Sequence, residues 1–149
     1  MTDQEGRPIA AAPSGKMVPE LSVSDFDRSL DFYVDLVGFE ILYARPESAF
    51  AYLSLDGAEL MIERTSGTWS TGPLEQPYGR GINFQIMVAD LAALHARLVT
   101  QGYPIMVPIE ERWYRRGDVF DGQQQFLVQD PDGYLLRFAE DLGTRREPA

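Results

Sequence analysis

Few residues of this chain have side chains suited to covalent chemistry. The sequence contains no cysteine and a single histidine, His95, and it lacks a G-x-S-x-G elbow, a P-loop and a Gly-rich dinucleotide motif. Glu20 and Glu63 could act as acid and base in a shared site, because burial raises the pKa of a carboxyl group and a nearby Arg137 would lower it. Two glutamates on strand faces are a weak catalytic signal, so we interpret them as binding or solvated groups.

The histidine and the most recognisable aspartates are better explained by local structure than by catalysis. His95 lies four residues after Leu91 in a segment with helical periodicity, and we expect it on a helix surface away from a ligand site. Asp25, Asp90 and the turn at 130–133 have the positions of helix caps and of a β-turn. We therefore assign structural roles to all of them.

The elements that would position the candidate residues occur twice. Val23-Ser24-Asp25 leads to Gly38-Phe39, and Val88-Ala89-Asp90 leads to Gly102-Tyr103, about 65 residues further along the chain. Each copy combines the end of a strand, a helix and a turn, so a whole supersecondary module recurs. We expect two similar modules that form a two-part cup.

The first module is predicted to contain one strand, one helix and three further strands. Alternating polar and apolar residues predict a half-buried strand over residues 17–23. Ser24 then takes the position of a helix N-cap, and the helix ends at Gly38. Asp56-Gly57 is a strong hairpin turn between the last two strands. The three strands are predicted at residues 40–44, 50–55 and 59–64.

The second module repeats this order of elements. Its strands are predicted at residues 82–88, 105–107, 124–129 and 134–139, and its helix at residues 91–99. Residues 65–80 link the two modules. Residues 109–123 are predicted to form a long loop that carries Trp113, and a loop of that length with a tryptophan is typical of a segment that closes over a site.

Composition and charge restrict the class of protein. With 149 residues and 44% hydrophobic content, the chain is expected to form a single domain over residues 17–142, with loose tails at 1–16 and 143–149. The sequence has no apolar run long enough to span a bilayer and no secretory signal, so we expect a cytoplasmic protein without a membrane partner. A net charge of −10 disfavours nucleic acid as a partner and favours cations.

Two stretches resemble the vicinal oxygen chelate superfamily, which includes glyoxalases, bleomycin resistance proteins and ring-cleaving dioxygenases. Residues 19–39 carry V-x-D-x-x-x-S-x-x-F-Y and end in Gly-Phe, and residues 126–138 carry D-P-D-G-Y-L-L-R-F. The resemblance extends over residues 17–142. It implies an α+β fold in which two βαβββ modules join into a curved mixed sheet, with helices outside and a ligand cup inside.

The metal-binding positions implied by this resemblance are largely replaced. Enzymes of the superfamily hold a divalent metal on the first strand and the closing strand of each module. In this sequence those positions correspond to Val18, Asn83, Arg137 and either Met61 or Glu63. An open catalytic metal site needs about three protein ligands, and at most one plausible ligand remains here. We therefore expect no metal, no other cofactor and no enzymatic activity.

The start of the first strand resembles the bleomycin resistance proteins more closely. Val18-Pro19-Glu20-Leu21 matches the V-P-x-L of that branch. The resemblance implies a homodimer in which the N-terminal strand hooks onto the partner subunit, and acidic grooves that bind a cationic drug without altering it. The halves of the cup are then built either within one chain or across two.

Strand parity and the resemblance together give a predicted ligand site. Residues that share a strand face with Val18 or Asn83 are expected to line the cup, and aromatic rings there can stack on flat heterocycles or hold cations. Trp113 and Tyr114 fall where the resistance proteins carry a tryptophan that stacks on the drug. The predicted ligand-binding residues are Glu20, Tyr43, Phe50, Tyr52, Glu63, Gln85, Trp113, Tyr114 and Arg137.

The sequence thus favours non-catalytic binding and sequestration of a small aromatic or cationic molecule, as in bleomycin-family antibiotic resistance. One alternative is a metal-dependent enzyme, similar to glyoxalases or dioxygenases, with a site rebuilt around Glu63, Glu20 and Asn83. Another is a protein-interaction module whose long loop docks a second polypeptide.

Overall fold

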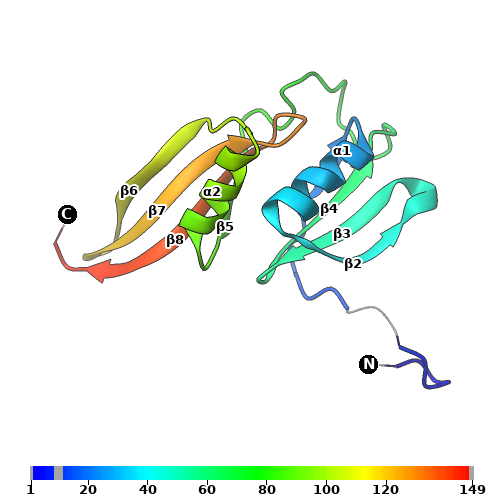
Figure 1. Cartoon of the computed structure of the whole chain (residues 1–149), viewed down its shortest axis with the longest axis horizontal. Coiled ribbons are helices and arrows are strands. Elements are labelled where there is room, and N and C mark those ends of the chain that lie inside the picture. The colour runs from blue at the N-terminus through cyan, green and yellow to red at the C-terminus, as the bar shows by residue number, and fades with distance from the viewer. Residues whose placement is uncertain (1, 9–11, 148–149) are drawn as a thin grey trace. The chain divides into compact units, whose positions relative to one another are not determined.

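The computed structural model describes residues 2–8 and 12–147, and the chain divides into two compact units (Figure 1). The first unit runs to Leu74 and the second begins at Glu75. Each unit contains a four-stranded mixed sheet and one main helical segment, in the order βαβββ. The duplicated α+β module predicted from the sequence is therefore confirmed. None of the helices within the described residues is long and apolar enough to cross a membrane.

The first unit places its first strand beside its last. The strand order is β1-β4-β3-β2; β1 is parallel to β4, and the other neighbours are antiparallel. The elements are β1 (Glu20–Val23), α1 (Phe26–Leu30), a wider helical segment η1 (Asp31–Val37), β2 (Glu40–Arg45), the short turn η2 (Pro46–Ser48), β3 (Phe50–Leu55) and β4 (Ala58–Arg64).

Local signals account for these boundaries. The N-cap of α1 is Asp25, which agrees with the capping role assigned to this aspartate and not with Ser24 as the N-cap, and its side chain accepts a hydrogen bond from the Arg28 backbone N–H at 3.1 Å. The helical segment ends at Gly38, as expected. Asp56 and Gly57 both have positive φ, which is the geometry that a tight two-residue hairpin turn requires. The predicted strands of this unit are correct to within a few residues.

One face of the first sheet packs under the helical segment and forms the core of the unit. On β1 and β4 the buried side chains alternate with less buried ones, which belong to the opposite face of the sheet. On β3 four consecutive residues, 50–53, are buried. The core includes Leu21, Val23, Phe32, Tyr33, Leu53 and Ile62, each no more than 3% exposed.

The second unit has the same topology with longer strands. Its strand order is β5-β8-β7-β6, with β5 parallel to β8. Asp90 caps the helix as predicted, accepting a hydrogen bond from the Ala93 N–H at 3.0 Å. The elements are β5 (Asn83–Met87), α2 (Leu91–Thr100), β6 (Val107–Arg116), β7 (Val119–Gln129) and β8 (Leu135–Arg145).

The predicted long loop at residues 109–123 is wrong, because most of that segment forms β6 and the start of β7. Arg116 pairs with Val119 across a two-residue turn, and Gly117 has a φ of 64°. Gly-Asp is a recognised turn pair for a hairpin of this kind, so the signal was present in the sequence. Strand β5 pairs only with Leu135–Ala139, and the other three strands continue past it as a long ribbon (Figure 1).

The predicted tails are also partly ordered. Strand β8 runs to Arg145, three residues into the predicted C-terminal tail. Near the other end, the Ser14 N–H donates a hydrogen bond to Glu59 Oε1 at 2.9 Å. Residues 1, 9–11 and 148–149 of the predicted tails lie outside the described residues.

Candidate functional site

The non-core face of the first sheet brings together all the ligand-binding residues predicted in the first unit. In one row across the sheet, Glu20 lies beside Met61, then Tyr52 and Tyr43. In the next row, Ser22 lies beside Glu63, then Phe50 and Arg45. We call this surface the acidic face of the first unit; it carries Glu20, Glu59, Glu63, Tyr43, Phe50, Tyr52, Met61 and Arg45.

The carboxylates of Glu20 and Glu63 lie on the acidic face together and repel each other. Partial removal from water raises the pKa of the Glu20 carboxyl, the negative charge of Glu63 raises it further, and the positive charge of Arg45 lowers it. Among the described residues Arg45 forms no ion pair within 4 Å. The carboxylates are therefore only partly compensated, and an added cation would be attracted to them.

The aromatic rings of the acidic face are already stacked. Tyr43 lies parallel to Tyr52 with ring centroids 5.2 Å apart, and it lies 5.9 Å from Phe50. The Arg45 guanidinium lies over the Phe50 ring at 4.0 Å, in cation–π geometry. Phe50 and Tyr52 are buried, whereas Tyr43 is half-buried and Arg45 is exposed. A ligand would therefore meet Tyr43 and Arg45 first.

Arg45 was missed by the sequence reasoning. It is two residues after Tyr43, so strand periodicity places both side chains on one face of β2. That signal was available. The sequence alone did not show that Arg45 pairs with Phe50, which follows from the register between β2 and β3.

Glu59 and Tyr52 form the margin of this face. Burial raises the pKa of Tyr52, and the nearby Glu59 carboxylate raises it further. The Tyr52 hydroxyl nevertheless has no partner in hydrogen-bonding geometry among the described residues. Glu59 instead accepts hydrogen bonds from the backbone N–H and the hydroxyl of Ser14, at 2.9 and 3.3 Å. The N-terminal segment is thereby attached to the edge of the acidic face.

In the second unit, Gln85, Tyr114 and Arg137 share the corresponding sheet face. Gln85 on β5 is the register partner of Arg137 on β8, and Leu127 on β7 lies on the other side of Arg137. The Tyr114 hydroxyl donates to Gln125 Oε1 at 3.3 Å. These side chains belong to a surface rich in amides, which we call the amide face; it carries Gln85, Gln123, Gln125, Glu110, Tyr114 and Arg137.

Trp113 lies on the opposite face from Tyr114. It pairs across the sheet with Gly122, where an added Cβ would lie 2.6 Å from the indole ring, and the Arg145 guanidinium covers the ring at 3.8 Å. The indole N–H is buried without a hydrogen-bond partner in the described part of the chain. Strand β6 therefore separates two residues that the sequence reasoning had placed together in one loop.

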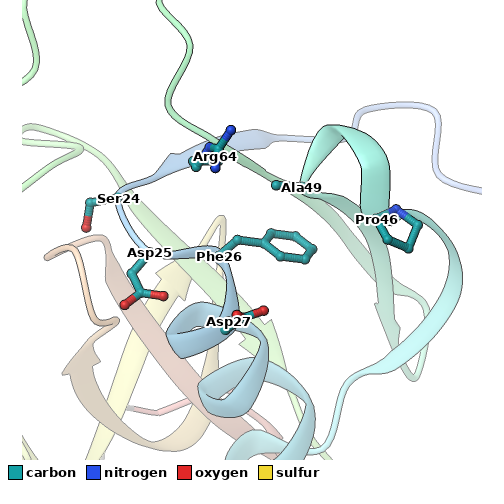
Figure 2. Close-up of a pocket in the computed structure, with 7 residues that line it drawn as sticks. All are labelled: Ser24, Asp25, Phe26, Asp27, Pro46, Ala49 and Arg64. Carbon is teal, nitrogen blue, oxygen red and sulfur yellow. The ribbon is translucent and has the colours of Figure 1, made fainter.

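Two hollows in the first unit contain none of the predicted ligand-binding residues. The larger, of about 440 Å³, lies where β1 meets α1, and the Phe26 ring projects into it (Figure 2). It is lined by Ser24, Asp25, Phe26, Asp27, Pro46, Ala49 and Arg64. The second, of about 350 Å³, lies by the turn at Asp56. Asp25 is already used as the cap of α1, so the larger hollow offers no free acid-base pair around it.

The residues at the superfamily's metal positions do not fit a divalent ion. Val18 and Met61 lack an oxygen or nitrogen ligand, and Arg137 is a fixed cation. If the metal position on the last strand of the first unit falls on Glu63 instead of Met61, the neighbour of Glu63 on β1 is Ser22. Over residues 2–8 and 12–147, the structure contains no group of three or more His, Asp or Glu residues that could hold a metal.

Comparison with known proteins agrees with this architecture. The Glyoxalase/Bleomycin resistance protein/Dioxygenase superfamily model matches residues 17–138. A superfamily member from Vibrio splendidus 12B01 is 40% identical; the match covers 84% of this chain and 97% of that one, with a TM-score of 0.40. TioX from Micromonospora sp. ML1 is 26% identical over 87% of this chain and 100% of that one, with a TM-score of 0.67.

A glyoxalase/bleomycin resistance protein/dioxygenase from Alicyclobacillus acidocaldarius is 20% identical; the match covers 89% of this chain and 95% of that one, with a TM-score of 0.62. No curated protein matches the sequence. The match to the family model spans both βαβββ units almost completely. The chain therefore belongs to the Glyoxalase/Bleomycin resistance protein/Dioxygenase superfamily.

Proposed function

We propose that this protein binds a small aromatic or cationic molecule and releases it unchanged, as the bleomycin resistance branch of the superfamily does. The observation that carries the proposal is the position of Arg45. Its planar cationic group lies 4.0 Å over the Phe50 ring, on the face that carries Glu20 and Glu63. This contact supports the proposal, because it places a flat cationic group against an aromatic ring of the acidic face.

The chain is poorly suited to metal-assisted catalysis. The metal positions of the superfamily hold Val18, Asn83, Arg137 and either Met61 or Glu63, which leaves at most one carboxylate ligand for a Lewis acid. Glu20 and Glu63 are the remaining candidates for proton transfer. Their negative charges lie on one sheet face and together attract a cation, and Arg45 offsets only part of that attraction.

Binding can be tested by calorimetric titration with metal-free bleomycin and with the planar cation proflavine. We expect saturable binding that weakens in high salt, because exposed charges are screened. Glu20→Gln and Glu63→Gln should each weaken binding several-fold. Glu75→Gln removes the same charge from an exposed position outside the acidic face, and it should change the affinity less than twofold.

Arg45→Gln distinguishes this site from general attraction to an acidic protein. The variant makes the net charge more negative and uncovers Phe50, so a cation that binds over this ring should bind more tightly. A neutral analogue of the cation should gain much less. No heat with either probe at high micromolar concentration, or equal losses for Glu20→Gln and Glu75→Gln, would refute the proposal. If Mn²⁺, Ni²⁺, Fe²⁺ or Zn²⁺ raised the thermal stability instead, the enzyme alternative would be favoured.

We also propose that the protein is a homodimer in which the N-terminal strand reaches the partner subunit. Strand β1 is four residues long and lies at the edge of its sheet, the position from which a strand can extend pairing to another chain. Light scattering should give twice the chain mass of 16.8 kDa. A monomer mass at all concentrations would contradict this assembly.

A further inference from the structure

Arg137 differs from Arg112 and Arg116, two other arginines of the second sheet. Arg112 pairs with Glu110 at 3.1 Å, and Arg116 pairs with Asp121 at 2.6 Å. Arg137 is half-buried, has no ion pair within the described residues, and its Nε is buried without a hydrogen-bond acceptor there. Buried polar groups normally have partners, so an arginine left in this state requires an explanation.

Gln85, the residue beside Arg137, also has a side-chain N–H donor without a strong acceptor. Gln85 on β5 is the register partner of Arg137, and Gln85 Oε1 accepts a hydrogen bond from Gln123 Nε2 at 3.2 Å. Among the described residues, the acceptor for the amide nitrogen of Gln85 is the Met87 sulfur, at 3.6 Å, and a thioether is a weak acceptor. Two neighbouring side chains therefore present N–H groups without a strong acceptor.

The acceptors on the amide face are already committed. Gln125 Oε1 accepts from Gln123 Nε2 at 2.7 Å and from Tyr114 at 3.3 Å. The Glu110 carboxylate accepts from Gln125 at 3.0 Å and from Arg112 at 3.1 Å, and these two donors lower its pKa. No carboxylate of the amide face is left to neutralise Arg137.

We propose that Arg137 and Gln85 hold the carboxylate group of a small-molecule ligand. A guanidinium presents two parallel N–H groups that match the two oxygens of a carboxylate. Leu127 and Val107 continue the same row across the sheet, so the ligand would have an apolar body next to its charged group. This site takes an anion at the position where the superfamily's enzymes hold a metal, and it depends on the second unit alone, not on the proposed cation site.

The test is a nuclear magnetic resonance titration of the ¹⁵N-labelled protein with benzoate, followed at the arginine Nε–Hε and glutamine side-chain signals. We expect saturable shifts at Arg137 and Gln85 with benzoate and none with benzamide, its neutral analogue. Arg137→Gln should weaken benzoate binding by about tenfold or more, since a charge-assisted bidentate pair is lost. Arg137→Lys keeps the charge without the paired donors and should also lose most of the affinity.

Two control variants separate the loss of this site from a general effect of charge and from the proposed cation site. Arg145→Gln removes the same charge from the same strand, but on the Trp113 side, and it should leave the affinity within twofold. Glu20→Gln should have no effect on benzoate, which separates this site from the cation site. Equal binding of benzamide, of inorganic phosphate, or of benzoate by a folded Arg137→Gln variant would overturn the proposal.

Discussion

Replacing Arg137 by methionine is expected to stabilise the ligand-free protein. The variant removes a buried Nε that has no acceptor among the described residues, and it keeps an unbranched side chain of similar length next to Leu127. A buried donor without a partner costs about 1–3 kcal/mol. Because Arg137 is only half-buried, we expect a gain of about 1 kcal/mol, near the lower end of that range.

Arg145→Met is the matched control, because it makes the same substitution on the same strand. Arg145 covers the Trp113 ring at 3.8 Å, and an exposed cation–π contact contributes about 0.5–1 kcal/mol. This variant should therefore lose stability while Arg137→Met gains it. The opposite signs remove any common effect of the change in net charge, which is identical in the two proteins.

Urea unfolding followed by circular dichroism measures both variants. We expect the midpoint for Arg137→Met to rise at an unchanged m-value, and the midpoint for Arg145→Met to fall. A gain of about 1 kcal/mol corresponds to a rise of about 2–4 °C in Tm for a chain of this size. If Arg137→Met were destabilised by about 1 kcal/mol or more, Arg137 would have a structural partner and the reasoning for an anion site would fail.

Two further substitutions test the packing and the electrostatics. Gly122→Ala should destabilise the protein by about 1–3 kcal/mol, because its Cβ would lie 2.6 Å from the Trp113 ring. The control Gly72→Ala, whose Cβ would meet nothing within 4 Å, should have little effect. Similar urea midpoints for the two variants would show that the Trp113 ring moves aside freely. Glu20→Gln should stabilise the protein slightly at pH 7, by less than about 0.5 kcal/mol, since this charge is exposed. The raised pKa means that the folded state binds the proton of Glu20 more tightly than the unfolded state. The benefit of Glu20→Gln should therefore fade as the pH falls through that pKa, and a benefit that grew towards pH 3.5 in urea titrations would contradict the sign.

Most of the fold could be predicted because its signals are local. Asp90, Gly38 and the Asp56-Gly57 turn fix element boundaries through bonds or backbone angles within a few residues. The hairpin of β6 and β7 was missed for the opposite reason. Its outer half extends beyond β5 and has little apolar alternation, so it depends on cross-strand partners such as Arg116 and Asp121, which bond at 2.6 Å.

The sequence by itself determined the two modules, the residue types at the metal positions, and the face of each strand on which most candidates lie. Side chains alternate with a period of two along any strand, so Glu20 and Glu63 could be assigned to the non-core face before the structure was known. Only the tertiary structure decided which side chains meet across the strands. Pairing of the adjacent strands β2 and β3, with a register shift between Ile41 and Tyr43, placed Arg45 over Phe50.

The pairing of β5 with β8 placed Arg137 beside Gln85, and the Arg137 Nε has no acceptor among the described residues. The formation of strand β6, in place of a loop, turned Trp113 away from Tyr114. Strand periodicity is a property of one segment, whereas register is a property of two paired segments. For this reason the sequence could name some residues of the acidic and amide faces, whereas Arg45, Glu110, Gln123 and Gln125 were found only in the folded sheets, which also show how the charges on these faces are paired.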